Sequence, residues 1–316
     1  MPQVQEIIAE IEAAIAEALS FEPEEMRLVR TGKHGDNAGS FGQYFATLDI
    51  YAGMMRDYAG YTLYPMIRMA QSGDYDARTL AGMFAAFSPA YATYLGYSGV
   101  RKLGDFAAAL KDAFVVASVA DIAAGLIALN RYVNRLNSWS HHYFPWALGE
   151  QFRYDSVPER DERYYETGNS FKKGSIGDLY IRMTWEPLGI SAVAELATRD
   201  NPELCADFLA GLPFRVTQEH AVVTGESMYA WTPIMSTAPV NWREMIREAP
   251  FGRMRYSQNT GQKLIIQYGP TTEDLYAPVL GQILPEYLPG IRSLGEKVWD
   301  ANYTTKALIW LTVEKI

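Results

Sequence analysis

The sequence is poor in cysteine and in positive charge, and each shortage excludes a class of protein. Cys205 is the single cysteine among 316 residues. An intramolecular disulfide and a cysteine-rich metal site are therefore excluded, which fits a reducing compartment. The net charge is -9 at pH 7, so the surface repels phosphate backbones and we expect no nucleic-acid partner.

An export signal and a long apolar run are also missing. Residues 1–19 carry glutamates where a signal peptide carries lysines or arginines. The longest apolar stretch, Ala113–Asn130, is rich in alanine and contains Asp121, which favours a buried helix over a membrane span. We expect a cytoplasmic protein with no membrane partner.

Several motifs of cofactor and catalytic sites do not occur in the sequence. There is no GxGxxG fingerprint for a dinucleotide, no GxSxG elbow of a hydrolase and no HExxH metal motif. The adjacent His141 and His142 would point about 100° apart on a helix, so they cannot both reach one ion. We therefore expect no cofactor and no metal.

The first half of the sequence has helical periodicity. Its length and its 48% hydrophobic content suit a soluble protein of two domains. Amphipathic or alanine-rich patterns predict helices over four segments: Pro2–Leu19, Phe41–Gln71, Asp76–Tyr97 and Phe106 to about Tyr143. Asp105 is the expected cap of the last helix, which would be the longest element and the spine of a bundle.

The spacing of apolar residues changes from helical to alternating after a charged, glycine-rich stretch at Gln151–Gly177. Short alternating segments then predict a barrel. We expect strands at Leu179–Glu186, Ile190–Leu196, Phe214–Val223, Ser227–Trp231, Arg253–Ser257, Lys263–Tyr268 and Lys306–Lys315, and helices after Asn201 and around Ile291–Trp299. The prediction is an α+β chain with an all-α helical bundle over residues 1–165 and a β-barrel over residues 166–316.

The stretch Asn130–Glu150, NRYVNRLNSWSHHYFPWALGE, contains the most unusual helix surface. At helical spacing, Arg131, Arg135, Ser138 and His142 share one stripe, and asparagines with His141 form a neighbouring one. An ordinary solvated face is rich in glutamate and lysine instead. The alternative is a helix end in which cationic histidines stabilise the helix dipole while the aromatic residues fill a core.

Two parts of the chain resemble known families. The hairpin, the Asn-Pro-Glu helix, Phe214-Arg-Val and the segment HAVVTGESMY (His220–Tyr229) resemble small bacterial cyclophilin-like barrels. The catalytic Phe-His-Arg and Gln-Gly-Gly stretches of prolyl isomerases are absent, so that activity is not expected. Joined to a bundle with NRLNSWSHHYFPWALG, the barrel is similar to cucumopine synthase and its bacterial relatives.

This resemblance implies an opine-forming reaction without reduction. Such enzymes condense L-histidine with 2-oxoglutarate by a Pictet-Spengler ring closure and need no cofactor. The substrates bring three carboxylates into one pocket, so arginines are the expected contacts. The candidates are Arg131, Arg135, Arg215, Arg253 and Arg255, and for each the alternative is a surface ion pair.

The same chemistry needs a proton donor and a base, which a histidine can supply near neutral pH. His142 is the first candidate and His141 the second, with Glu226 and Tyr229 as further catalytic groups. His220 and Tyr268 could bind or orient the carbonyl oxygen, although a strand histidine with internal partners is the alternative. Trp139, Tyr143, Trp146 and Trp231 could form a wall for a bound ring, or they pack in the core.

A non-catalytic protein is the second hypothesis for the whole chain. In it the barrel would bind a small organic acid and the bundle would supply a dimer interface. Under either hypothesis we expect small-molecule ligands, namely an amino acid or a keto acid, and a homodimer.

Overall fold

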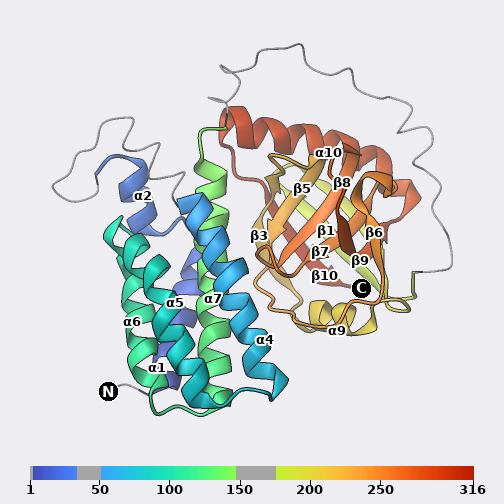
Figure 1. Cartoon of the computed structure of the whole chain (residues 1–316). Helices are drawn as coiled ribbons and strands as arrows, with labels where there is room; N and C mark the ends of the chain where they lie inside the picture. Colours follow the sequence, from blue (N-terminus) through green and yellow to red (C-terminus); the bar gives the residue numbers. More distant parts are fainter. Residues whose placement is uncertain (1–2, 34–50, 147–175) are drawn as a thin grey trace. The chain divides into compact units, whose positions relative to one another are not determined.

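The computed structural model describes residues 3–33, 51–146 and 176–316, and these fall into two compact units (Figure 1). One unit consists mainly of the chain up to Phe144 and the other mainly of the chain from Pro145 onward. The predicted boundary at residues 165 and 166 and the predicted helix start at Phe41 lie outside the described residues. The α+β prediction of a bundle followed by a barrel is confirmed.

The first unit is a helical bundle around one central helix. Its elements within the described residues are α1 (Val4–Ala18), α2 (Glu24–Arg30), the π-helix η1 (Tyr58–Leu63), α4 (Tyr64–Ser72), α5 (Ala77–Tyr97), α6 (Arg101–Phe114) and α7 (Val119–Tyr143). Helix α7 packs against α1, α4, α5, α6 and η1. The predicted amphipathic face of α1 is buried through Ile7, Ile11 and Ile15, as its period requires.

The single helix predicted from Phe106 to Tyr143 was wrong. The chain leaves α6 after Phe114 and starts α7 at Val119. Ser118 caps the new helix, since its Oγ accepts the Asp121 N–H at 3.1 Å. Asp105 lies inside α6 and is not a cap. The apolar run concealed the break because Val115 and Val116 are apolar in sequence yet highly exposed.

The second unit is an antiparallel barrel. Its strands are β1 (Tyr180–Glu186), β2 (Ile190–Leu196), β3 (Phe214–Thr217), β4 (Glu219–His220), β5 (Gly225–Trp231), β6 (Arg243–Met245), β7 (Arg253–Ser257), β8 (Lys263–Thr271), β9 (Tyr276–Ile283) and β10 (Trp310–Lys315). The order is β3-β10-β1-β2-β9-β7-β8-β5-β4, with β6 on β9. Strands β3 and β4 are separated by Gln218 alone, so the two ends of this order meet in one segment and the sheet nearly closes.

The barrel interior is apolar, and helices cover its ends. Met183, Trp185, Met228, Met254 and Ile266 are fully buried or nearly so. Helices α9 (Pro202–Ala210) and α10 (Leu288–Asp300) lie at opposite ends of the barrel (Figure 1). A short π-helix, η5 (Ala301–Thr305), extends α10. Within the described residues, no helix is both long and apolar enough to cross a membrane.

Two strands were missed because their residues disfavour strands in isolation. Strand β9 contains Pro278 and Gly281, which normally weaken a strand assignment. The structure requires the glycine, since a Cβ at Gly281 would lie 2.3 Å from the Glu195 carbonyl oxygen on β2. Strand β6 is only three residues long. Both strands form through pairing across the barrel, which no local pattern reveals.

Asn201 precedes α9 as predicted, but its side chain does not cap the helix. Its Nδ2 donates to the carbonyl oxygens of Trp242 (2.9 Å) and Val279 (2.7 Å). Its Oδ1 accepts from the backbone N–H groups of Asn241 (2.9 Å) and Trp242 (2.8 Å). The amide therefore ties a loop to β9 with both of its polar atoms partnered.

The cap at Ser118 predicts a measurable loss of stability. Ser118→Ala removes the acceptor for the Asp121 N–H, and we expect the bundle to lose about 1 kcal/mol of unfolding free energy. Ser118→Thr keeps the hydroxyl and should remain close to the original protein. Urea unfolding followed by circular dichroism measures both, and equal stability of the two variants would contradict the assigned cap.

Candidate functional site

The last turns of α7 bury an unusual number of polar side chains. None of eight polar residues exceeds 8% exposure: Asn130, Asn134, Arg135, Asn137, Ser138, Ser140, His141 and His142. We call this group the α7 polar end. Burying polar groups is unfavourable unless they form hydrogen bonds. The predicted polar face is therefore an internal surface, in contrast to an ordinary solvated face.

The two arginines of the predicted stripe have different surroundings. Arg131 is partly exposed and forms an ion pair with Glu12 of α1. Arg135 is 2% exposed. The pairing seen for Arg131 is the alternative that the sequence left open, and a substrate role for either arginine stays a prediction.

A chain of amides connects the α7 polar end to the π-helix η1. Asn130 donates from Nδ2 to the carbonyl oxygen of Ala59 at 2.8 Å. Asn134 donates from Nδ2 to Asn130 Oδ1 at 2.9 Å. π-Helical turns are frequent at functional sites, and here one supplies a carbonyl that orients two buried amides.

Aromatic residues and an arginine surround the end of α7. The ring of His142 meets that of Tyr143 edge-on at 4.8 Å, and Tyr143 stacks with Trp139 at 6.1 Å. The Trp139 indole donates to the Ala18 carbonyl oxygen at 2.7 Å, which anchors it to α1. Trp146, just beyond the helix, is partly buried. These rings form the predicted aromatic surroundings of the histidines, and contact of any of them with substrate stays a prediction.

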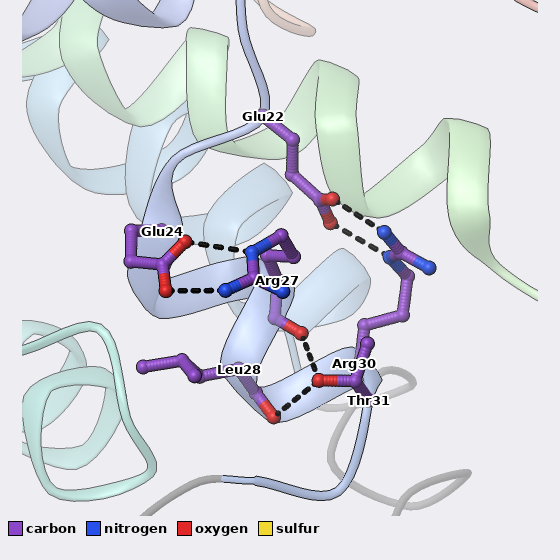
Figure 2. Close-up of polar contacts among 6 residues, drawn as sticks. All are labelled: Glu22, Glu24, Arg27, Leu28, Arg30 and Thr31. Carbon is purple, nitrogen blue, oxygen red and sulfur yellow. Dashed lines mark hydrogen bonds and ion pairs between the residues drawn. The ribbon is translucent and has the colours of Figure 1, made fainter.

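Arg30 was not predicted as part of this group. Its guanidinium lies 4.0 Å from the centre of the Tyr143 ring, within the range of a cation-π contact. Glu22 holds it through two hydrogen bonds, to Nε at 2.9 Å and to Nη2 at 2.6 Å (Figure 2). Arg30 and Tyr143 are over a hundred residues apart in the sequence, so no local pattern could have joined them.

The barrel carries a second buried polar group on its outer face. It comprises the buried Ser227 of β5, Gln267 of β8, Arg253 and Arg255 of β7 and Gln282 of β9, together with the half-buried Tyr229 of β5; we call it the outer polar strip. Directly paired positions share a face, and Ser227 pairs with Gln267 and Arg253 with Gln282. Elsewhere the outer face is exposed, for example at Arg182 and Glu186 of β1.

The two arginines of this strip are deeply buried cations. Arg255 is 0% exposed and Arg253 is 5% exposed. Arg255 donates from Nη2 to Ser227 Oγ at 3.3 Å. Arg253 donates from Nε to Glu244 at 2.5 Å and lies 5.1 Å from the Trp242 ring centre. Guanidinium groups held in this way suit the binding of carboxylates.

The chain after β6 covers part of the outer polar strip. Gln267 donates to the Ala249 carbonyl oxygen at 3.3 Å, and Gln282 donates to that of Phe251 at 2.8 Å. The strip is therefore shielded by backbone groups that only tertiary folding brings there. Of its members, the sequence had pointed to Tyr229, Arg253 and Arg255.

Tyr229 is the predicted proton donor in this region. Its hydroxyl is hydrogen-bonded to Thr224, and the Lys263 ammonium lies 4.4 Å from its ring centre. Burial raises the pKa of Tyr229 and outweighs the opposing effects of Thr224 and Arg255. The phenol therefore stays protonated at neutral pH, as a proton donor must be. Glu226, on the same strand, is partly buried, and its catalytic role stays a prediction.

His220 and Tyr268 form a closed pair inside the barrel. His220 Nδ1 lies 2.6 Å from the Ala221 carbonyl oxygen, which can only accept. Nδ1 must therefore carry the proton, and Nε2 accepts the Tyr268 hydroxyl at 2.7 Å. Both side chains are at most 2% exposed. This geometry agrees with the alternative of a strand histidine with internal partners, and substrate binding by either residue stays a prediction.

Arg215 and Cys205 are not members of the outer polar strip. Arg215 is exposed, and its guanidinium lies 3.9 Å from Glu186 and 4.0 Å from the centre of the Trp310 ring. A substrate role for Arg215 stays a prediction. Cys205 is buried in α9, and burial raises the pKa of its thiol to about 12. It is a small core residue rather than a nucleophile.

A half-buried lysine, Lys306, lies in the segment between η5 and β10. Lys306 donates to the carbonyl oxygen of Asn302, whose side chain donates to Glu219 at 2.6 Å. Burial lowers the pKa of Lys306 to about 8, against an opposing effect of Glu219. The folded state therefore disfavours the charged amine, and this penalty is full below pH 8. It fades as the pH rises from about 8 toward the unfolded value of about 10.4.

Lys306→Met should therefore raise the melting temperature at pH 7. The gain over the original protein should shrink as the pH rises through 8 to 10, because the penalty on the native lysine disappears there. Thermal unfolding at several pH values tests this, with Lys315→Met at the exposed end of β10 as the control. A gain that stays constant with pH would contradict the proposed cause.

One family model matches the helical part of the chain. Residues 4–143 match the family model described as the cucumopine synthase C-terminal helical bundle domain, and in this chain the matched bundle precedes the barrel. The structure of McbB in complex with tryptophan is similar at 32% identity and a TM-score of 0.39, over 42% of this chain and 44% of McbB. The chain thus spans less than half of that protein.

A second solved structure is the hypothetical protein AF2241 from Archaeoglobus fulgidus. It is 15% identical with a TM-score of 0.33, over 46% of this chain and 100% of that one. No curated protein matches the chain. The family match confirms the predicted resemblance to cucumopine synthase for the helical part of the chain.

Proposed function

Because residues 4–143 match the cucumopine synthase helical bundle domain, we propose that this chain is a cofactor-free Pictet-Spengler synthase. Its substrates are L-histidine, or a related amine, and 2-oxoglutarate or another keto acid. The amine and the keto carbonyl condense to an imine and release one water. A ring carbon of the amine substrate then attacks the imine carbon and loses its proton, so no oxidant or reductant is consumed. The family match is the observation that carries this proposal.

The buried cations support the binding half of the proposal. Two amino or keto acid substrates with three carboxylates need cationic partners in a protein of net charge -9. Arg135 of α7 and Arg255 of β7 are each at most 2% exposed. Hydrogen bonds from such groups to a carboxylate contribute roughly 1.5 to 3 kcal/mol each.

We assign the acid and base steps to histidine, tyrosine and glutamate side chains that can donate or accept a proton. His142 takes the proton from the ring carbon after cyclisation, and His141 is the second candidate. Tyr229, which burial keeps protonated, donates to the carbonyl oxygen that leaves as water, with Glu226 as a further acid-base group. A positioned acid or base contributes typically about 100- to 10,000-fold.

The reaction itself is tested by mass spectrometry. Purified protein with L-histidine and 2-oxoglutarate should form a product with the mass of their sum less one water. A cyclised product resists borohydride, whereas an open imine is reduced, and heat-treated protein measures the uncatalysed background. Absence of product with histidine and with other aromatic ethylamines would favour the non-catalytic binding hypothesis.

His142 should control turnover if it is the base. His142→Asn keeps a polar side chain of similar reach but cannot accept a proton near neutral pH. Turnover should fall at least about tenfold, with an unchanged melting temperature. Steady-state rates of product formation measure this, and undiminished turnover would remove His142 from the mechanism.

The arginine candidates can be separated by paired substitutions. Arg255→Lys removes a buried fork of donors, so the KM for the keto acid should rise roughly tenfold or more, as one lost charged hydrogen bond implies. Arg215→Lys, at an exposed position, should change KM less than twofold. Equal effects of the two substitutions would contradict a carboxylate contact at Arg255.

A further inference from the structure

Helix α5 has an outer surface without charge. Residues 79–100, which include all but the first two residues of this helix, contain no aspartate, glutamate, lysine, arginine or histidine. Phe87, Tyr94 and Tyr97 are each at least 45% exposed. At 100° per residue these three lie within about 80° of one another, and we call them the α5 aromatic face. A surface helix normally directs charged residues outward, so an exposed aromatic face is typical of an interaction surface.

A hollow adjoins the α5 aromatic face, between α5 and α6. These helices lie side by side (Figure 1) and approach closely at two glycines, since a Cβ at Gly96 would lie 3.3 Å from the Gly104 Cα. The hollow measures about 320 Å³ including the space at its mouth, and its lining includes Ala92, Thr93, Ala107, Ala108 and Lys111. Thr93 lies one helical turn before Tyr97. Protruding rings and a hollow therefore occur next to each other on one surface.

The charges of α6 favour a second copy of this chain as the partner. Its exposed charged residues have both signs: Arg101, Lys102, Asp105, Lys111 and Asp112. A nucleic acid or an anionic lipid surface is attracted by cations in clear excess, which this face does not have. Two copies of net charge -9 repel each other overall. They can approach most readily through a face of little net charge, such as the one that α5 and α6 provide.

The size of this two-helix face also suits a dimer. Helix α5 has 21 residues and α6 has 14. At about 1.5 Å per residue and about 10 Å per helix, the two present a flat area of roughly 500 Å². The protruding rings and the hollow add to this area. Specific interfaces bury about 600 Å² or more per partner, so we expect a dimer that dissociates on dilution.

We propose that α5 and α6 form the contact face of a homodimer, in which the α5 aromatic face of each copy packs over the hollow of the other. In a two-fold dimer every contact occurs twice, so a surface with both rings and a hollow is complementary to itself. The sequence predicts a homodimer, and this inference assigns the surface that forms it. The inference does not depend on the proposed function, because no residue of this face is assigned to substrate binding or proton transfer.

Phe87→Glu and Tyr94→Glu test this face in the full chain by sedimentation velocity at several protein concentrations. The original protein should sediment as a dimer that dissociates on dilution. Each substitution should raise the dissociation constant at least about tenfold, because the two-fold interface then buries the new charge twice. Phe21→Glu is the matched control, since Phe21 is 70% exposed between α1 and α2, and it should leave the dissociation constant unchanged. Circular dichroism shows that each variant is folded.

A dimer weakened by substitution at Phe87 or Tyr94, and not at Phe21, supports the inference. A dimer that survives both of the first two substitutions overturns it, because another surface then joins the copies. Equal weakening by Phe21→Glu also overturns it, since added negative charge alone would be the cause. A monomer at every concentration rejects the dimer. If that monomer floats with vesicles of phosphatidylcholine and phosphatidylserine, and Tyr94→Glu abolishes the flotation, the α5 aromatic face binds a membrane instead.

Discussion

Burial of the α7 polar end is the constraint on which the bundle depends. A helix whose last turns are enclosed on all sides must find a partner for each asparagine, arginine and histidine, because water cannot supply one there. In the bundle, backbone carbonyl groups of neighbouring segments supply some of these partners. The carbonyl of Ala59 in a π-helix orients Asn130, and that of Ala18 holds Trp139. Helix α7 therefore organises its neighbours through polar contacts as well as through apolar packing.

The barrel also buries polar side chains. Its interior is filled mainly with apolar side chains, and the polar pair His220 and Tyr268 is hydrogen-bonded internally. A group of its buried polar side chains lies on one part of the outer face, where Arg253 and Arg255 are buried and the chain that follows β6 covers Gln267 and Gln282. Buried guanidinium groups are costly without anionic or polar partners. Both units thus carry buried cations in an acidic protein, which is consistent with the proposed carboxylate substrates.

The family match concerns the bundle, and this unit also contains the histidines proposed for catalysis. In this chain the bundle precedes the barrel, and each unit has its own core. The proposed chemistry therefore depends on side chains that the units supply, and their sequence order does not decide it.

The sequence by itself determined most of the elements, because periodicity is a local property. Helices α1, α5, α9 and α10 and strands β1, β2, β7 and β8 were all expected near their observed positions. It also pointed to the residues of the α7 polar end. Only the tertiary structure decided which polar faces are enclosed: Arg131 pairs with Glu12 while Arg135 is buried, and Arg30 reaches Tyr143. Strand β9, with its proline and glycine, likewise forms only against its neighbours. These outcomes depend on contacts between distant segments, which a local pattern does not contain.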